Sequence, residues 1–167
     1  MLSSDDVVHA IYAEPEVIEA VHHRFGGAAL TPDGRVDRAA LGDLAFGEPE
    51  GIAFLEGLVH PRVGAAREAW QDTQRRRTPP PPLLVCEVPL LYEAGLVDRF
   101  DAVLVVTASE PVRRARVAAR GQDFSARSGR QMTEDEKMHR ADRYLVNDGS
   151  MSQVEEWVAE RFEEYRT

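Results

Sequence analysis

The sequence predicts an α/β domain with a parallel sheet that is covered by helices on both faces. Two short apolar runs, 83–88 and 102–108, have the length and composition of buried strands. Segments with helical patterning precede, separate and follow these runs, and such alternation is typical of a parallel sheet. With 167 residues, the chain has the size of one domain that can bury a core.

Composition excludes several classes of protein. Hydrophobic residues make up 43% of the chain, but no apolar stretch is long enough to span a bilayer, so we expect no membrane partner. The first ten residues have neither a basic nor an apolar region and do not resemble a signal peptide. Cys86 is the one cysteine, which excludes a disulfide framework and a multi-cysteine zinc site and suits the cytoplasm.

The charge distribution points to a localised anionic ligand. The net charge is −9, from 20 basic and 29 acidic side chains, which makes nucleic acid an unfavourable partner. The segment 112–131 nevertheless holds six arginines and one aspartate, a local charge of +5. These arginines are Arg113, Arg114, Arg116, Arg120, Arg127 and Arg130.

Start and stop signals divide the first part of the chain into helices. Ser3 and the serine after it can begin a helix, because their side-chain oxygens can accept from its free N–H groups. Pro15 begins a second helix that Gly26 ends. Asp37 can cap a third helix, which we expect to end at Phe46.

A proline is expected to interrupt the helical pattern that follows. Residues 49–59 and 61–77 are predicted to be two helices with a break at His60-Pro61, because proline disfavours helical geometry in the residue before it. The four prolines at 79–82 then form a stiff extended connector. We interpret this connector as a loop within one domain.

The rest of the chain alternates apolar runs with helical segments. Residues 90–96 have a helical pattern, and a helix capped at 109–111 follows the second run. Residues 121–129 lack periodicity and are expected to form a loop. The remaining elements are predicted to be a capped helix, a short strand and a closing amphipathic helix, at 133–142, 144–146 and 151–165.

Four short motifs occur in one order along the chain. They are Leu-Val-His-Pro at 58–61, Glu-Val-Pro-Leu-Leu-Tyr-Glu at 87–93, Ala-Asp at 141–142 and Asn-Asp-Gly at 147–149. In this order the motifs resemble dephospho-coenzyme A kinase, a family of P-loop kinases. The resemblance covers essentially the whole chain.

The resemblance implies a P-loop kinase-type parallel sheet and ATP-dependent phosphorylation of the 3′-hydroxyl of dephospho-CoA, the last step of coenzyme A synthesis. It implies ATP and Mg²⁺ as cofactors and dephospho-CoA as the small-molecule partner of a cytoplasmic enzyme, which we expect to be a monomer. On this sequence the helical substrate region corresponds to residues 7–77, the nucleotide core to 83–108 and 144–167, and a short lid to 120–131.

Asp5 is the candidate catalytic residue. It corresponds to the second acid of a D-A-D motif in the family, and the resemblance implies that it is the base or the orienter of the attacking hydroxyl. Ser3 stands in place of the first acid. Without the resemblance, Asp5 and Asp6 would be interpreted as charges that complement the dipole of a helix start, and Asp6 keeps that interpretation.

Two further residues are candidates for substrate binding. Glu87 ends the first apolar run, where ligands gather in open α/β sheets, and its carboxylate needs a partner such as Mg²⁺-bound water or an arginine. His60 is either structural or a contact in the substrate region, and we assign it no catalytic role. Glu93 is expected on the helix after the strand.

The nucleotide is expected to meet the lid and the last motif. Three arginines flank a glycine-bearing segment suited to closing over ATP, and we predict that they contact phosphate: Arg120, Arg127 and Arg130. The three arginines before them can form an ordinary solvated helix face. The resemblance implies that Asn147 lies near the adenine, although Asn-Asp-Gly is also typical of a turn.

The phosphate-binding loop of a P-loop kinase does not occur in this sequence. No G-x-x-x-x-G-K-[ST] pattern is present, and Lys137, the one lysine, has no glycine nearby. The resemblance implies a strand, this loop and a helix ahead of the first residue, so we expect a truncated or wrongly started chain whose sheet lacks a central strand. Because the loop would hold the phosphates and Mg²⁺, we expect this chain to be inactive as given.

Two other functions remain open from the sequence. One is a protein that binds a coenzyme A precursor or a nucleotide and has lost phosphoryl transfer. The other is a different P-loop nucleoside or nucleotide kinase, which the order of the four motifs disfavours.

Overall fold

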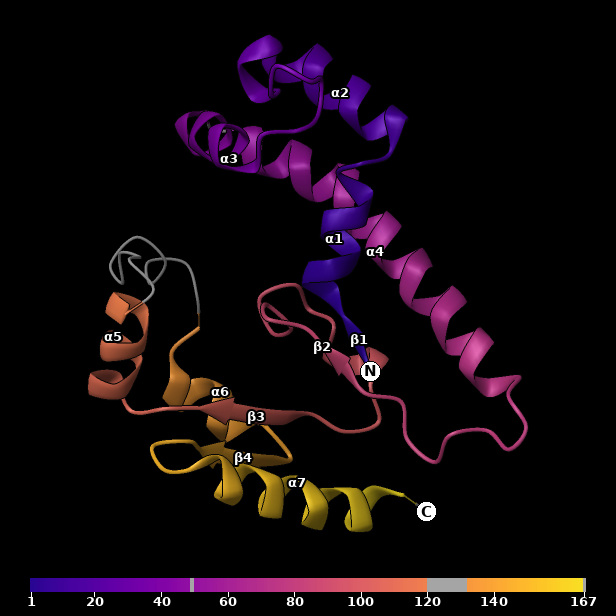
Figure 1. Ribbon diagram of the computed structural model, residues 1–167, viewed down its shortest axis with the longest axis vertical. Coiled ribbons are helices and arrows are strands. Elements are labelled where there is room, and N and C mark those ends of the chain that lie inside the picture. Colours follow the sequence, from indigo (N-terminus) through magenta and orange to yellow (C-terminus); the bar gives the residue numbers. More distant parts are fainter. Residues whose placement is uncertain (49, 120–131, 167) are drawn as a thin grey trace. The chain divides into compact units, whose positions relative to one another are not determined.

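The computed structural model describes residues 1–48, 50–119 and 132–166 (Figure 1). The chain divides into two compact units, Met1–Val88 and Pro89–Thr167, called unit 1 and unit 2. Unit 1 contains β1 (Leu2–Ser3), α1 (Ser4–Ile11), α2 (Pro15–Phe25), the 3-10 turn η1 (Gly27–Ala29), α3 (Arg38–Gly47), α4 (Gly51–Arg75) and β2 (Cys86–Glu87). Unit 2 contains η2 (Val97–Arg99), β3 (Leu104–Thr107), α5 (Glu110–Ala119), α6 (Glu134–Arg140), β4 (Arg143–Val146) and α7 (Met151–Tyr165).

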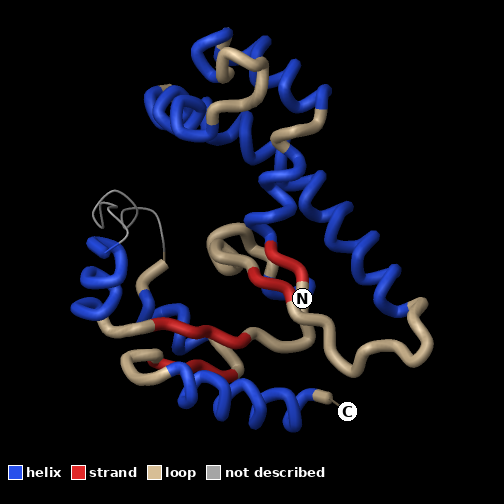
Figure 2. The backbone as a smooth tube through the Cα atoms, in the orientation of Figure 1, coloured by secondary structure: helices blue, strands red, loops and turns tan. Residues whose placement is uncertain are grey.

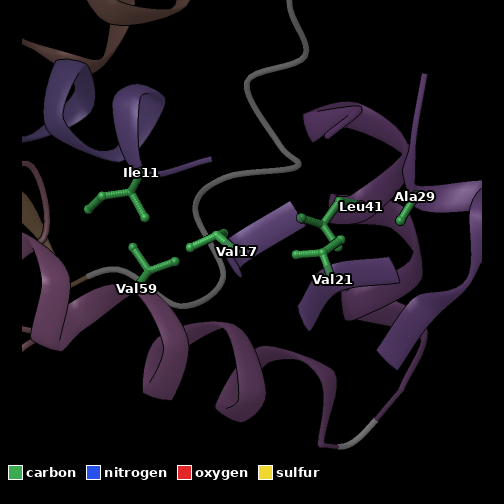
Figure 3. Close-up of a cluster of buried hydrophobic side chains, with 6 residues drawn as sticks. All are labelled: Ile11, Val17, Val21, Ala29, Leu41 and Val59. Atoms are coloured by element: carbon green, nitrogen blue, oxygen red, sulfur yellow. The ribbon is translucent and has the colours of Figure 1, made fainter. Parts of the chain in front are cut away.

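The core of unit 1 is a cluster of aliphatic side chains between its helices (Figure 3). Each helix contributes because its apolar residues recur every three or four positions and so form one face. Burial of this face is the main source of stability for short helices. The cluster consists of Ile11, Val17, Val21, Ala29, Leu41 and Val59.

The helix ends of unit 1 largely follow the sequence signals. Pro15 is the first residue of α2, and Gly26 ends that helix with a φ of 75°, a conformation that favours glycine. The Asp37 carboxylate accepts from the N–H groups of Ala39 and Ala40 at 3.0 and 3.1 Å, so it caps α3 as predicted. The cap expected from Ser3 is absent, since its side chain makes no capping hydrogen bond to the described first turn of α1.

The predicted break at His60-Pro61 is wrong, because α4 runs through it without interruption (Figure 2). Proline removes one N–H donor from a helix, but it does not remove the apolar face on either side. Val59 is buried in the core cluster, and Val63, one turn later, packs against the same cluster. Packing on both sides of Pro61 therefore outweighs the local preference for a bend.

Unit 1 also holds a two-stranded parallel ladder. Leu2 is in register with Cys86 and Ser3 with Glu87, and the N–H of Leu2 donates to the carbonyl of Val85 at 2.9 Å. The strand predicted over 83–88 is therefore shorter, because its described partner is two residues long. It is also less buried than expected, since 54% of Val85 is exposed.

The sheet of unit 2 pairs β3 with β4 in parallel, from Leu104↔Arg143 to Thr107↔Val146. The strands predicted at 102–108 and 144–146 are present. The burial predicted for the run 102–108 is wrong in part, because 41% of Leu104 and 53% of Val106 are exposed. In the described residues each of these strands has one hydrogen-bonded neighbour. The missing central strand therefore stays a prediction.

The described part of unit 2 has three α-helices, α5, α6 and α7, and their positions along the chain largely follow the sequence signals. Helix α6 opens with a complete capping box between Thr133 and Glu136, as the sequence predicts. Helix α7 lies alongside β4 (Figure 1), and Arg143 donates to Glu164. The prediction of a helix over 90–96 is wrong, because the segment forms turns that end at Gly95, whose φ is 64°.

Among the described residues, no helix has the length and apolar character needed to cross a membrane.

Candidate functional site

The carboxyl ends of β1 and β2 bring two predicted site residues to one edge. Ser3 pairs with Glu87 in a parallel ladder, so both strands end at the same edge. Asp5 follows Ser3 by two residues and lies in the first turn of α1. Asp5 and Glu87 are both exposed. We call this part of unit 1 the acidic edge. It presents two carboxylates beside the free N–H groups of a helix start.

Arg67, a cation that the sequence analysis did not single out, lies near the acidic edge. Arg67 on α4 is only 9% exposed. Burial raises the pKa of the Cys86 thiol, while the positive charges of Arg67 and the terminal amine act against that rise. The sequence contained a signal for this position, because Val59, Val63 and Arg67 are spaced by four residues along one helix face.

His60 lies apart from the predicted catalytic residue. His60 is exposed, and the residue before it, Val59, packs in the core cluster with Ile11. Ile11 is the last residue of α1, whereas Asp5 lies in the first turn of that helix. In the described part of unit 1, the imidazole makes no hydrogen bond or ion pair with Asp5 or Glu87. The substrate-binding role of His60 therefore stays a prediction.

The carboxyl ends of β3 and β4 form a second edge, which we call the polar edge. The N–H of Asn147 donates to the carbonyl of Thr107 at 2.7 Å, and Arg116 donates to the carbonyl of Asn147 at 3.0 Å. Asp148 accepts from the N–H of Ser109 at 2.7 Å. The main chain of Asn147 is therefore held on both sides. Its half-buried amide makes no side-chain hydrogen bond within the described residues.

The helices on either side of residues 120–131 meet at the polar edge through Glu134. Its carboxylate accepts from the Thr107 hydroxyl at 2.5 Å and lies 3.5 Å from the Arg113 guanidinium. Arg113 also donates to the carbonyl of Ala108 at 3.0 Å. The interpretation as a solvated helix face is therefore wrong for Arg113, which is half-buried, whereas Arg116 is exposed and fits it while also contacting Asn147. Arg114 fits it, since it pairs with Glu110 one turn before it on the exposed face of α5.

A largely buried ion pair joins the turns after residue 89 to α6. The ammonium of Lys137 lies 3.3 Å from the Glu93 carboxylate, and the two side chains are 13% and 18% exposed. The same carboxylate accepts from the N–H of Met132 at 2.9 Å. Burial acts to raise the pKa of Glu93, but its own N–H, that of Met132 and the charge of Lys137 together hold the pKa below its ordinary value.

The three predicted lid arginines, Arg120, Arg127 and Arg130, lie outside the described residues. Their contact with phosphate therefore stays a prediction. Nor do the described residues contain a group of three or more His, Cys, Asp or Glu side chains that could hold a metal ion by themselves.

Comparison with known proteins shows the family to which this chain belongs. The family model described as dephospho-CoA kinase matches residues 2–153. This chain belongs to the dephospho-CoA kinase family. The resemblance predicted from the four motifs is thereby confirmed, and with it the assignment to an α/β fold of the P-loop kinase type.

Individual relatives agree with this assignment. Over 159 residues the chain is 36% identical to a dephospho-CoA kinase of Symbiobacterium thermophilum. This alignment covers 92% of this chain and 66% of the relative. Over the same length it is 35% identical to a dephospho-CoA kinase of Deinococcus radiodurans, with coverage of 93% and 75%. The chain thus spans 66 to 75% of the length of these two relatives.

Solved structures have the same fold. The protein TT1252 from Thermus thermophilus superposes with a TM-score of 0.79 at 34% identity, over 98% of this chain and 83% of that one. A dephospho-CoA kinase from Campylobacter jejuni superposes with a TM-score of 0.68 at 22% identity, with the same coverage, and this second likeness concerns the fold alone.

Proposed function

We propose that the chain belongs to an ATP-dependent kinase for the 3′-hydroxyl of dephospho-CoA, with the acidic edge on the acceptor side and the polar edge on the nucleotide side. The observation that carries this proposal is the family match over residues 2–153. The presence of Asp5 at the same strand edge as Glu87 supports it, because carboxylates at such an edge can reach a bound ligand.

Asp5 is proposed to act on the attacking hydroxyl. As the oxygen of the hydroxyl forms its bond to the γ-phosphorus and ADP leaves, the hydroxyl proton passes to the Asp5 carboxylate. Phosphoryl transfer depends mainly on positioning and on charge stabilisation, so a carboxylate that orients the nucleophile is sufficient for this role. The exposure of Asp5 keeps it accessible to a substrate.

Asn147 is proposed to contact the adenine. Its main chain is held by Thr107 and Arg116, while its amide is left with one acceptor and two donors for a ligand. A base edge that carries both donors and acceptors matches this group. The Asn-Asp-Gly segment then serves as both a turn and a contact.

Magnesium is proposed to enter with ATP, because Mg²⁺ is usually bound through one or two carboxylates and the substrate phosphates. The acidic edge fits such a site, since Asp5 and Glu87 are two exposed carboxylates. Glu87 is the residue proposed to contact the hydrated ion, which would supply charge neutralisation at the phosphates. Arg120, Arg127 and Arg130 remain the proposed phosphate contacts.

The proposal is tested by measuring ADP release and coenzyme A formation from ATP and dephospho-CoA. Two proteins are compared: the 167-residue chain, and the same chain preceded by a strand, a G-x-x-x-x-G-K-[ST] loop and a helix, the three elements that the resemblance implies. Because no G-x-x-x-x-G-K-[ST] loop occurs in the 167 residues, we expect turnover from the extended protein and very little from the shorter one.

The outcomes separate the alternatives. Turnover of another nucleoside or nucleotide in preference to dephospho-CoA would contradict the proposed acceptor. Binding of dephospho-CoA without turnover by either protein would favour the non-catalytic binding function. Robust turnover by the 167-residue chain would contradict the expectation that it is inactive as given. Gel filtration of the same samples tests the predicted monomer.

A further inference from the structure

The lone lysine of this chain has contacts that indicate a structural role in nucleotide binding rather than a phosphate contact. Its ammonium lies 3.3 Å from the Glu93 carboxylate, and the Lys137 side chain is 13% exposed. A phosphate ligand needs a cation that can reach solvent or a bound anion. Lys137 is instead directed to an acidic partner within unit 2.

Two residues of the 87–93 motif hold the same helix. Besides the Glu93 ion pair, the hydroxyl of Tyr92 donates to the carbonyl of Lys137 at 3.4 Å, and the ring of Tyr92 lies 4.8 Å from the guanidinium of Arg140. Tyr92 is 8% exposed. Helix α6 is therefore attached to this segment by an ion pair, a hydrogen bond and a cation–π contact.

The opposite end of α6 is attached to the polar edge. Glu134, the first residue of the helix, accepts from Thr107 at the end of β3 and contacts Arg113 on α5. The main-chain carbonyl of Thr107 in turn accepts from the N–H of Asn147. One short helix thus links the Tyr92–Glu93 segment to the main chain on which Asn147 lies.

We propose that Lys137 and Glu93 are positioning residues that hold α6 so that Glu134 keeps the polar edge in a nucleotide-binding arrangement. The pair touches no part of the proposed nucleotide contact. The pair acts through α6, which has seven residues. Because this helix is short, its attachment to Glu93 and its attachment to Thr107 are expected to move together. This inference rests on the proposed nucleotide side of the polar edge.

The test measures ADP affinity of the 167-residue chain by NMR titration, which is sensitive to weak binding. Lys137→Met removes the charge and keeps an unbranched apolar side chain, whereas Lys137→Arg keeps the charge. We expect Lys137→Met to weaken ADP binding by about tenfold, as a factor typical of the loss of one well-placed interaction. We expect Lys137→Arg to recover most of that loss.

Arg161→Met is the matched control. Arg161 is 21% exposed and pairs with Glu160 and Glu164 on α7, so its loss also removes a half-buried cation from unit 2. Within the described residues, the partners of Arg161 all lie on α7, including the ring of Trp157. We expect this variant to lower the unfolding midpoint while leaving ADP affinity unchanged within a factor of two.

Each result decides a separate point. Equal ADP affinity in Lys137→Met and the unaltered chain would overturn the positioning role, and so would an equal loss in Arg161→Met. If Lys137→Met does not fold, Glu93→Gln replaces it, because glutamine keeps an acceptor for Met132 and removes the charge. No ADP binding by the unaltered chain would overturn the proposed nucleotide site and this inference with it, whereas binding with unchanged variants would overturn the inference alone.

Discussion

The two strand edges of this chain differ in how their polar side chains are held. At the acidic edge of unit 1, Asp5 and Glu87 are exposed; Asp5 comes two residues after the end of β1, and Glu87 is the last residue of β2. At the polar edge of unit 2, Thr107 and Glu134 are held by hydrogen bonds and an ion pair to neighbouring elements. The difference indicates a division of roles. Accessible carboxylates are suited to act on a substrate, whereas a bonded network is suited to hold main chain in place.

The largest effect is expected at Asp5. In a protein with kinase activity, Asp5→Asn removes the proposed proton acceptor, and we expect kcat to fall by about 10²- to 10⁴-fold. Asp6→Asn is the matched control, because Asp6 is also exposed and lies in the same first turn of α1. The coupled assay of ADP release measures both variants. Equal losses in the two would assign Asp5 to the helix dipole alone.

A smaller effect, on stability rather than catalysis, is expected at the polar edge. Thr107→Val removes the hydroxyl that donates to Glu134 and should lower the free energy of unfolding by about 1–3 kcal/mol, the usual range when a buried polar group loses its partner. Thr73→Val is the control, since the Thr73 hydroxyl donates to the carbonyl of Ala69 on an exposed part of α4. Urea unfolding followed by circular dichroism measures the difference. Equal values would remove the distinction between the edges.

The pH dependence of stability should reflect Glu93. Its pKa is held below the ordinary value of 4.5, so near and just below that value the unfolded chain binds more protons than the folded chain. The contribution of Glu93 is therefore fully present above the ordinary pKa and is lost as the pH falls through the lowered folded-state pKa. Urea unfolding at a series of pH values should show a shallower acid loss for Glu93→Gln. Parallel curves for the two proteins would contradict this assignment.

The smallest effect on stability is expected at Glu87. Because its carboxylate is exposed, Glu87→Gln should change the free energy of unfolding by no more than about 0.5 kcal/mol, as is usual for surface substitutions. The same variant should reduce phosphoryl transfer if Glu87 contacts the hydrated ion. A large loss of stability would instead place Glu87 among the structural residues and weaken the contrast between the two edges.

Local signals in the sequence predicted much of the secondary structure. The cap at Asp37, the ends of α2 and the capping box of α6 are confirmed, because each depends on a few neighbouring residues. The predictions of a break at Pro61 and of a helix over 90–96 are wrong. At Pro61 the local preference lost to packing on both sides, and a helical apolar pattern does not distinguish a helix from successive turns.

The candidate site was predictable in part. The residues at strand ends, Asp5, Glu87 and Asn147, could be located because strand boundaries and motifs are visible in the sequence. The partners of Glu134 and Lys137 could not. Thr107 lies 27 residues from Glu134, and Glu93 lies 44 residues from Lys137, so nothing local in the sequence links them.

The sequence by itself determined the family, the α/β class and the absence of a phosphate-loop motif from these 167 residues, because each is a matter of residue type and order. The tertiary structure alone decided which side chains meet. It paired the one lysine with Glu93, joined Glu134 to the end of β3 and left Asp5 exposed. Those pairings depend on how distant segments pack, and a buried charge is stable only where the fold provides an opposite charge or a hydrogen bond.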